Sequence, residues 1–384
     1  MLKKNNFFKS YFTNSKIYNK NLKKTKKYFN SFLIDLKNNK IPLMESYEKE
    51  YQFNFTKKRV KEFKKYKNII IIGMGGSILG AKSIYSYFKD KIKKEVFFFD
   101  NLDLNIYQNY KKIKNLKNSC FVVISKSGNT LETLTNFKTI SSELLLKNNL
   151  IIITELKDSN LLSIGQKFNA EIIEHNSLIG GRYSVLSEAG MFPAALMNLK
   201  INKFKNLSKL LGNTNFVSSL LNSVSSIYTL NQQGLKNSVI LNYDSKLNNL
   251  CFWLQQLIAE SLGKKGKGIT PIISQCPKDH HSLLQLYLDG PKDKFFTFLS
   301  SASNPNKKIE KTINAQCEAT KNVFKNKKIP FRHLILRKND EGELGATFTF
   351  FVLETILLAR LMNINPFNQP AVEEVKIETK KILS

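Results

Sequence analysis

Residues 69–77 read Ile-Ile-Ile-Ile-Gly-Met-Gly-Gly-Ser, and residues 120–130 read Cys-Phe-Val-Val-Ile-Ser-Lys-Ser-Gly-Asn-Thr. Each begins as a short apolar run, typical of a buried strand, and ends in a loop of glycines and hydroxyl side chains. A loop of this kind presents backbone N–H groups at a helix N-terminus, where the partial positive charge favours an anion. Because parallel strands end at one edge of a sheet, the two loops predict a phosphorylated small molecule in a crevice there.

The same rhythm of strand, loop and helix continues on both sides of these loops. It predicts right-handed crossovers and parallel sheets covered by helices on both faces, which is the α/β class. A polar stretch at 199–215 joins two halves of similar rhythm. The expected strands are 68–72, 96–100, 120–124, 150–154, 171–174, 238–242, 295–299 and 331–336.

Length and composition allow two domains. The chain has 384 residues, 42% of them hydrophobic, which is enough to bury a substantial core. Residues 1–66 are expected to be mainly helical, with apolar residues at helical spacing among lysines. We expect a basic helical arm at 1–48, a first domain at 49–200, and a second domain at 201–384 that ends in a helix.

The chain is strongly basic, with 60 Lys and Arg residues against 30 Asp and Glu and a formal charge of +30. Such a charge favours a polyanionic partner, such as nucleic acid or an acidic membrane surface. Outside the first 70 residues, however, the excess is diffuse and lacks the aromatic signature of RNA-binding modules. Lys, Asn, Ile and Phe have A/T-rich codons, so genomic base bias explains the lysines more simply. We therefore do not expect a nucleic acid partner.

Cysteine usage and apolar patterning favour a cytoplasmic location. The four cysteines lie far apart without a C-x-x-C pair, which argues against a disulfide framework. No apolar stretch of signal-peptide type follows the basic N-terminus. The longest apolar region, 346–362, is interrupted by Glu354 and Arg360, so it predicts a buried helix and not a membrane span.

The first glycine loop has three interpretations. Gly73-Met-Gly75 begins like the G-x-G-x-x-G fingerprint of dinucleotide sites, and Asp100 stands where a ribose-binding acid occurs. The third glycine would fall at Ile78, whose branched side chain obstructs close helix–strand packing, so a nicotinamide or flavin site is disfavoured. A structural tight turn and a phosphate or sugar contact remain. The second loop favours the contact.

The second loop clusters hydroxyl groups around Gly128. These groups are Ser125, Ser127, Thr130 and Thr133, and the last two are spaced to share one face of the following helix. Caps and turn formers are the structural alternative. Four hydroxyls at one strand end favour an anion.

Two further segments carry charged groups. Arg182 follows Gly180 and Gly181, and its guanidinium suits planar, oxygen-rich anions, although a lone Arg is commonly solvated or ion-paired. Gln256 and Glu260 are four residues apart on a helix that ends in a glycine-rich loop, so they face one side. Neither segment alone indicates a function.

The remaining candidates lie near the chain's end. His280 and His281, with Cys276, would make half of a zinc site, but a second ligand cluster is missing, so we do not expect a metal. A helix cap with a surface histidine is the alternative. Gln369 and Lys376 are seven apart and are expected two turns apart on one face of the last helix. Alone, Lys376 is a solvated lysine.

Together these segments resemble the glucose-6-phosphate isomerase family. The resembling stretches keep the family's order and span roughly residues 68–376. The first loop is generic to sugar-isomerase domains, whereas Gly-Gly-Arg-Tyr-Ser, Glu-Ser-x-Gly-Lys and Gln-Pro-x-Val-Glu are far more specific. The stretches are 71–80, 125–133, 180–187, 259–264, 281–291 and 364–374.

The resemblance implies two doubly wound parallel-sheet domains of the sugar-isomerase (SIS) type, a homodimer with a shared active site and no cofactor. It implies interconversion of glucose 6-phosphate and fructose 6-phosphate through an enediolate, with Glu260 as the base and Arg182 stabilising the enediolate. His281 would assist ring opening, and Lys376 would help in ring opening and phosphate binding. The implied substrate and phosphate contacts are Gly76, Ser77, Ser125, Lys126, Ser127, Thr130, Thr133, Gln256 and Gln369.

Three positions depart from the family pattern. Asn129 stands where Thr or another residue is common, and its loop also resembles that of dual glucose/mannose isomerases, which leaves sugar specificity open. His280 replaces a usual Gln and Ala371 a common Gly. A non-catalytic sugar-phosphate-binding regulator is the alternative from another class, but it leaves the implied catalytic residues unexplained as a set.

Overall fold

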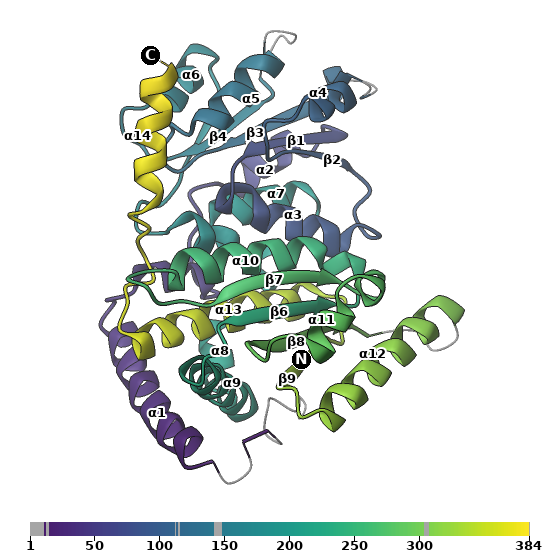
Figure 1. Cartoon of the computed structure of the whole chain (residues 1–384). Coiled ribbons are helices and arrows are strands. Elements are labelled where there is room, and N and C mark those ends of the chain that lie inside the picture. Colours follow the sequence, from purple (N-terminus) through teal and green to yellow (C-terminus); the bar gives the residue numbers. More distant parts are fainter. Residues whose placement is uncertain are drawn as a thin grey trace.

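Two parallel β-sheets, one in the upper and one in the lower half of Figure 1, form the framework of the protein. The computed structural model describes residues 11–12, 15–111, 113, 116–141, 148–302 and 307–383. The first sheet has the order β2-β1-β3-β4-β5 and the second the order β7-β6-β8-β9. All their strand pairs are parallel, so the predicted α/β class is confirmed.

Of the nine strands within the described residues, eight agree with the sequence prediction to within two residues at each end. The ninth, β7, contains Pro271 and was not predicted. Proline removes a ladder donor, and it is tolerated here because β7 is an edge strand. The strands are β1 (Asn68–Gly73), β2 (Glu95–Phe99), β3 (Ser119–Ile124), β4 (Leu150–Thr154), β5 (Glu171–Glu174), β6 (Asn237–Asn242), β7 (Thr270–Gln275), β8 (Lys294–Ser301) and β9 (Phe331–Leu336).

Helices connect the strands and precede and follow the sheets. The α-helices are α1 (Lys16–Lys37), α2 (Lys57–Phe63), α3 (Gly76–Phe88), α4 (Leu104–Lys111), α5 (Leu131–Ser141), α6 (Asn160–Lys167), α7 (Glu188–Leu196), α8 (Leu207–Leu211), α9 (Thr214–Gln232), α10 (Asn248–Leu262), α11 (Leu284–Asp289), α12 (Lys308–Asn326), α13 (Glu341–Met362) and α14 (Val372–Leu383). The 3-10 helices are η1 (Pro42–Tyr47), η2 (Leu116–Asn118), η3 (Gly181–Leu186), η4 (Ile201–Lys203), η5 (Ser245–Leu247) and η6 (Lys278–His281).

The first sheet is covered on both faces, which explains its unbroken apolar strands. Ile69 and Ile71 of β1 point into a cluster completed by α2, α3 and α7. Ile70 and Ile72 point to the other face, where α4, α5 and α6 complete a second cluster. Because both faces are dry, β1, β3 and β4 are buried along their whole length.

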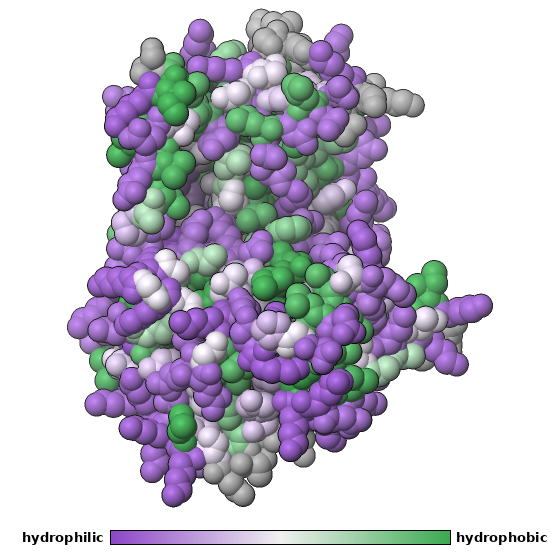
Figure 2. Space-filling model, viewed as in Figure 1, coloured by the Kyte–Doolittle hydropathy of each residue, from purple (hydrophilic) through white to green (hydrophobic). Residues whose placement is uncertain are grey.

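The two halves share one apolar core. The largest cluster joins Ile84 and Phe88 of α3 to Trp253 of α10 and Phe348 of α13, so it is continuous across residue 200. Figure 1 shows α3 and α10 between the two sheets. Polar side chains cover most of the face in Figure 2, while these apolar side chains lie inside. The domain boundary at 200 therefore stays a prediction.

Helix α13 is long and apolar enough to cross a membrane, but 89% of its most apolar window is buried in the protein. This agrees with the buried helix predicted at 346–362. Its interrupting charges are paired: Glu354 Oε1 accepts from Arg332 at 3.1 Å, and Arg360 donates to Asp35 at 2.7 Å. A carboxylate on the buried face is tolerated because a guanidinium meets it there.

Candidate active site

The carboxyl edge of the first sheet meets the C-terminal half of α10, and two glycines make this contact possible. A Cβ on Gly75 would lie 2.7 Å from Gln256 Nε2, and Gly75 also has a φ of +53°. A Cβ on Gly76 would lie 2.1 Å from the carbonyl carbon of Gly181. Both positions therefore need glycine. The first loop, η3 and α10 converge at this point.

Arg182 lies at the centre of this convergence, with a side chain only 1% exposed. Its Nε donates to Ser261 Oγ at 2.8 Å, and its Nη1 donates to Glu260 Oε2 at 3.0 Å and to Gln369 Oε1 at 2.8 Å. Its Nη2 donates to two backbone carbonyls in segment 366–368. These five contacts match the five N–H donors of a guanidinium, so the position and plane of the group are fixed.

Glu260 is held on both sides but remains within reach of solvent. Its Oε1 accepts from Gln256 Nε2 at 2.9 Å, and its Oε2 accepts from Arg182. The side chain is 32% exposed. Gln256 Oε1 is buried and has no hydrogen-bond partner in the described part of the chain. An orphaned acceptor beside a positioned carboxylate is typical of a site that a ligand completes.

The second loop forms a hydroxyl cluster at the end of β3. Ser125 Oγ and Thr130 Oγ1 lie 2.9 Å apart. Thr133 is 1% exposed, and its hydroxyl has no partner among the described residues. Thr130 lies just before α5 and Thr133 is its third residue, so the prediction that both share one face of this helix stays a prediction. The helix begins one residue later because the Thr130 carbonyl accepts its first hydrogen bond, from Leu134 N–H.

The other predicted phosphate contacts lie at the same edge of the first sheet. Ser77 is in the first turn of α3, and Ser127 is exposed. Lys126 Nζ donates to the Ser177 carbonyl at 2.7 Å and lies 3.7 Å from Glu155 Oε1. Partial burial lowers the pKa of Lys126, and the Glu155 carboxylate opposes that effect.

His281 does not join Glu260 within one chain. It lies exposed on η6, which follows the carboxyl end of β7. Helix α10 runs the opposite way, since Gln255 donates to the carbonyl of Pro271 near the beginning of β7. Glu260 lies twelve residues after the beginning of α10, about 18 Å along its axis at 1.5 Å per residue. His281 and Glu260 are thus at opposite edges of the second sheet.

The other histidine of this pair has a neighbour of its own. His280 Nε2 shares a hydrogen bond with Tyr243 Oη at 2.7 Å. In the part of the chain that the structure describes, no three His, Cys, Asp or Glu side chains gather as a metal site would require.

Lys376 and Gln369 do not lie on the same helix. Lys376 is 61% exposed on α14, the yellow helix of Figure 1, and its ammonium pairs with Glu373 at 2.7 Å. Gln369 precedes that helix, so the prediction that both residues share a helical face is wrong. The reason is tertiary: the bonds from Arg182 hold residues 366–369 in a non-helical segment.

The sequence analysis gave no function to three positioning residues: Tyr183, Ser261 and Lys264. Tyr183 Oη contacts Ser261 Oγ at 2.8 Å and donates to the Pro366 carbonyl at 3.0 Å. Lys264 Nζ donates to the backbone carbonyls of Ser261 at 3.2 Å and Asn365 at 2.5 Å. Burial, with the charge of Arg182, lowers the pKa of Lys264 to about 8. Their only sequence signal was their place inside the specific motifs.

The comparison with protein families matches the part of the chain that contains Arg182 and Glu260. The family model described as phosphoglucose isomerase matches residues 44–276. The chain is 34% identical over 343 residues to glucose-6-phosphate isomerase of Methanocaldococcus jannaschii, covering 83% of this chain and 84% of that protein. It is 30% identical over 350 residues to glucose-6-phosphate isomerase of Campylobacter jejuni, covering 83% and 86%.

Solved structures extend the similarity to the fold. The hypothetical protein TT0462 of Thermus thermophilus aligns over 100% of both chains with a TM-score of 0.80 and 20% identity. A glucose-6-phosphate isomerase of Chlamydia trachomatis aligns over 85% of this chain and 72% of that chain, with a TM-score of 0.74 and 20% identity. The predicted fold class, with two doubly wound sugar-isomerase type units, is confirmed.

Proposed function

Because the chain belongs to the phosphoglucose isomerase family, we propose that it interconverts glucose 6-phosphate and fructose 6-phosphate. The observation that carries this proposal is the pairing of Glu260 with the buried Arg182 at the edge that also bears the hydroxyl loop. A carboxylate, a fixed guanidinium and an anion-binding loop are the groups that a sugar-phosphate isomerase needs.

Glu260 acts as the base in this proposal. Its carboxylate removes the proton from C2 of the open-chain aldose, the C–H electrons form the C1–C2 double bond, and the carbonyl electrons move to O1. A proton then passes from the O2 hydroxyl to O1, the O2 electrons form the C2 carbonyl, and the electrons of the C1–C2 double bond take the proton back from Glu260 at C1, which gives the ketose. The hydrogen bonds from Gln256 and Arg182 hold the carboxylate in place, and its partial exposure leaves room for a substrate.

Arg182 stabilises the enediolate. Its charge is buried, so its field is weakly screened by water. Since its five contacts already use its N–H donors, an enediolate oxygen must replace one present acceptor. Ser261 and Gln369 are the neutral side chains among them, and Gln369 is exposed whereas Ser261 is buried, so Gln369 is the one that gives way. The rigid contacts to segment 366–368 keep the guanidinium oriented during that exchange.

The phosphate lies against the hydroxyl loop. Ser125, Thr130 and the unpartnered Thr133 supply hydroxyl donors, and Gly76, Ser77, Lys126 and Ser127 lie on the same edge. These contacts hold the substrate through a group remote from the reacting carbons. Gln256 and Gln369 contact the sugar from either side of Glu260.

We also propose a cytoplasmic homodimer with shared sites. Ring opening needs a proton donor and acceptor near the ring oxygen, and His281 is the family's residue for this step. Because His281 and Glu260 lie at opposite edges of one chain's second sheet, His281 of the partner subunit completes the site in this proposal. Lys376 of the exposed α14 assists ring opening and phosphate binding.

The activity is tested by coupling glucose 6-phosphate formation from fructose 6-phosphate to its NADP-dependent oxidation, with a metal chelator present. We expect turnover that the chelator does not change. No turnover by folded protein would contradict the proposal. Supplying mannose 6-phosphate in place of fructose 6-phosphate tests the dual isomerase, which the resemblance of the Ser-Gly-Asn-Thr loop leaves open. Asn129 itself bonds to Asn160, so its influence on the sugar would be indirect.

Replacing Ser125 and Thr130 together by Ala is expected to raise the KM for fructose 6-phosphate about 10-fold or more and to change kcat less. The hydroxyls contact the phosphate in our proposal, and each lost hydrogen bond to a charged group is worth roughly 1.5–3 kcal/mol. Inorganic phosphate should also protect the variant less against thermal unfolding. Equal protection of wild type and variant would place the anion elsewhere.

Replacing Lys264 by Met is expected to lower kcat roughly 10-fold, because the segment that holds Arg182 loses the bond to the Asn365 carbonyl. Lys265→Met is the matched control, since Lys265 is exposed. The KM should change little, because Lys264 positions Arg182 and does not touch the phosphate loop. Equal kcat values in the two variants would show that Lys264 has no positioning function.

A further inference from the structure

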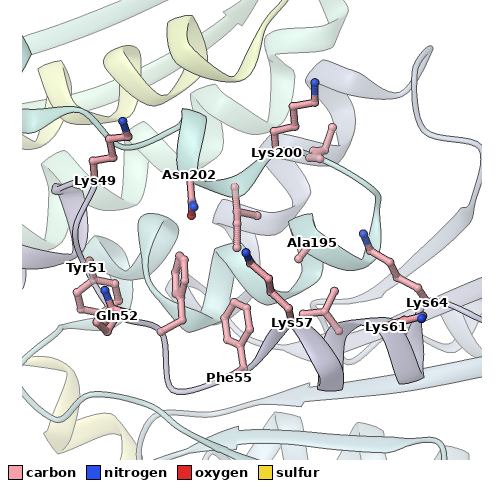
Figure 3. A pocket seen from close by; sticks show the side chains of 14 residues that line it. Lys49, Tyr51, Gln52, Phe55, Lys57, Lys61, Lys64, Ala195, Lys200 and Asn202 are labelled. Carbon is pink, nitrogen blue, oxygen red and sulfur yellow. The ribbon is translucent and has the colours of Figure 1, made fainter.

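A second cavity, of about 660 Å³, lies outside the candidate active site. It is formed by residues 49–64 on one side and by residues 195–202 on the other, and it shares no residue with the site around Arg182 (Figure 3). Its volume is in the range of small-molecule sites. The function proposed above does not use it.

Every charged side chain that lines this cavity is a lysine. Five of its 14 lining residues are lysines and none is Asp or Glu, although the whole chain has one acidic residue for every two basic ones. The five ammonium groups have no hydrogen-bond or ion-pair partner among the described residues. Their like charges repel one another, so a multivalent anion would be favoured there. These residues are Lys49, Lys57, Lys61, Lys64 and Lys200, which Figure 3 labels around the opening.

The floor of the cavity is aromatic. Phe53 and Phe55 stack with ring centroids 4.7 Å apart, and Tyr51 meets Phe53 edge-on at 5.5 Å. The segment is fixed from below, because Tyr51 Oη and the backbone N–H of Asn54 both donate to the buried Glu188, at 3.0 and 3.1 Å. The rings are therefore held in place before a ligand arrives, and a flat ring can stack on Phe55 at low cost in entropy.

A buried lysine lies behind these rings, and its burial lowers the pKa of the Lys205 amine to about 7. Lys205 is 2% exposed, and its ammonium lies 3.6 Å from the Phe53 ring centroid and 4.1 Å from that of Tyr51. It has no hydrogen-bond partner in the described part of the chain. Because Lys205 and Phe55 both lie against Phe53, the ring of Phe55 is the one left to stack with a ligand.

We propose that this cavity binds a nucleoside polyphosphate, with its base stacked on Phe55 and its phosphates among the lysines at the edge. Inorganic phosphate would leave the aromatic floor unused. A membrane surface could not enter a concave site, and an apolar ligand would leave the five ammonium groups uncompensated.

The proposal is tested by titrating ATP into the full-length protein without Mg²⁺, in 150 mM salt and with saturating fructose 6-phosphate to occupy the active site. We expect ATP to bind at one site per chain and at least ~10 times more tightly than inorganic tripolyphosphate or adenosine, since each probe lacks one half of the recognition. Tripolyphosphate binding as tight as that of ATP would show that the cavity binds polyanions by charge alone and does not recognise a base. ATP binding that appears only when fructose 6-phosphate is left out would assign the binding to the active site. Either result would overturn the proposal.

Two variants locate the binding. Lys57→Glu/Lys61→Glu should weaken ATP binding at least ~10-fold, and Phe55→Leu should weaken it several-fold while keeping the apolar contact with Phe192. The matched control is Lys23→Glu/Lys27→Glu on α1, which has the same spacing, exposure and charge change and should bind as wild type does.

Wild-type affinity in Lys57→Glu/Lys61→Glu would refute the cavity as the site. Sedimentation of the same variant gives an independent check. A change of oligomeric state in Lys57→Glu/Lys61→Glu, with unchanged sedimentation of the α1 control, would make this face a subunit contact and would also overturn the proposal.

Discussion

Replacing Glu260 by Gln is expected to lower kcat by about 10²–10⁴-fold, the range that a general base contributes. The amide has nearly the shape of the carboxylate but cannot remove a proton at neutral pH. The KM for fructose 6-phosphate should change much less, because the phosphate contacts lie on another loop. The measurement is steady-state kinetics in the coupled assay, with thermal unfolding recorded for the same preparation.

The fold should tolerate this change for a specific reason. The new amide places an NH₂ group beside either Arg182 or Gln256. Since Gln256 Oε1 is buried without a partner, a flip of that side chain would offer an acceptor to the new NH₂. Glu318→Gln, at an exposed position of α12, is the control, because it removes one negative charge outside the candidate active site. A folded Glu260→Gln protein with a near-normal rate would eliminate Glu260 as the base.

Mixing two inactive proteins, His281→Ala and Glu260→Gln, is expected to restore activity after dissociation and reassociation. In a two-fold dimer whose sites take Glu260 from one subunit and His281 from the other, half of a hybrid's two sites contain both residues. With random reassociation, about half of the dimers are hybrids, so about one quarter of the wild-type activity should return. Hybrid formation is measured by native mass spectrometry.

The opposite arrangement predicts a different result. If each subunit used its own pair, every site in the hybrid would lack one residue, and activity would stay at the level of the two parents. Confirmed hybrids without recovery would therefore refute the shared site. The geometry behind this expectation is the direction of α10, which carries Glu260 away from the edge where η6 presents His281.

The strands and the two glycine-and-hydroxyl loops were predictable because their signals are local. Ile69–Ile72 is apolar at every position, and the sheet buries it on both faces. The hydroxyl loop follows β3 where the sequence placed it, and Ser125 and Thr130 are in contact. Strand β7 was missed for a local reason as well: Pro271 and its polar neighbours lack the strand pattern, and only the edge position makes them acceptable.

The sequence by itself determined the α/β class, the two glycine-and-hydroxyl loops and the motif residues of the site. It did so because periodicity and turn chemistry act over a few neighbouring residues. Only the tertiary structure decided which of those residues meet. Arg182 contacts Glu260 across 78 positions and Gln369 across 187, and Gly76 reaches Gly181 because neither has a side chain. His281 and Lys376 stayed apart from them. Contacts over such separations depend on how helices pack between two sheets, and short-range patterns do not encode that packing residue by residue.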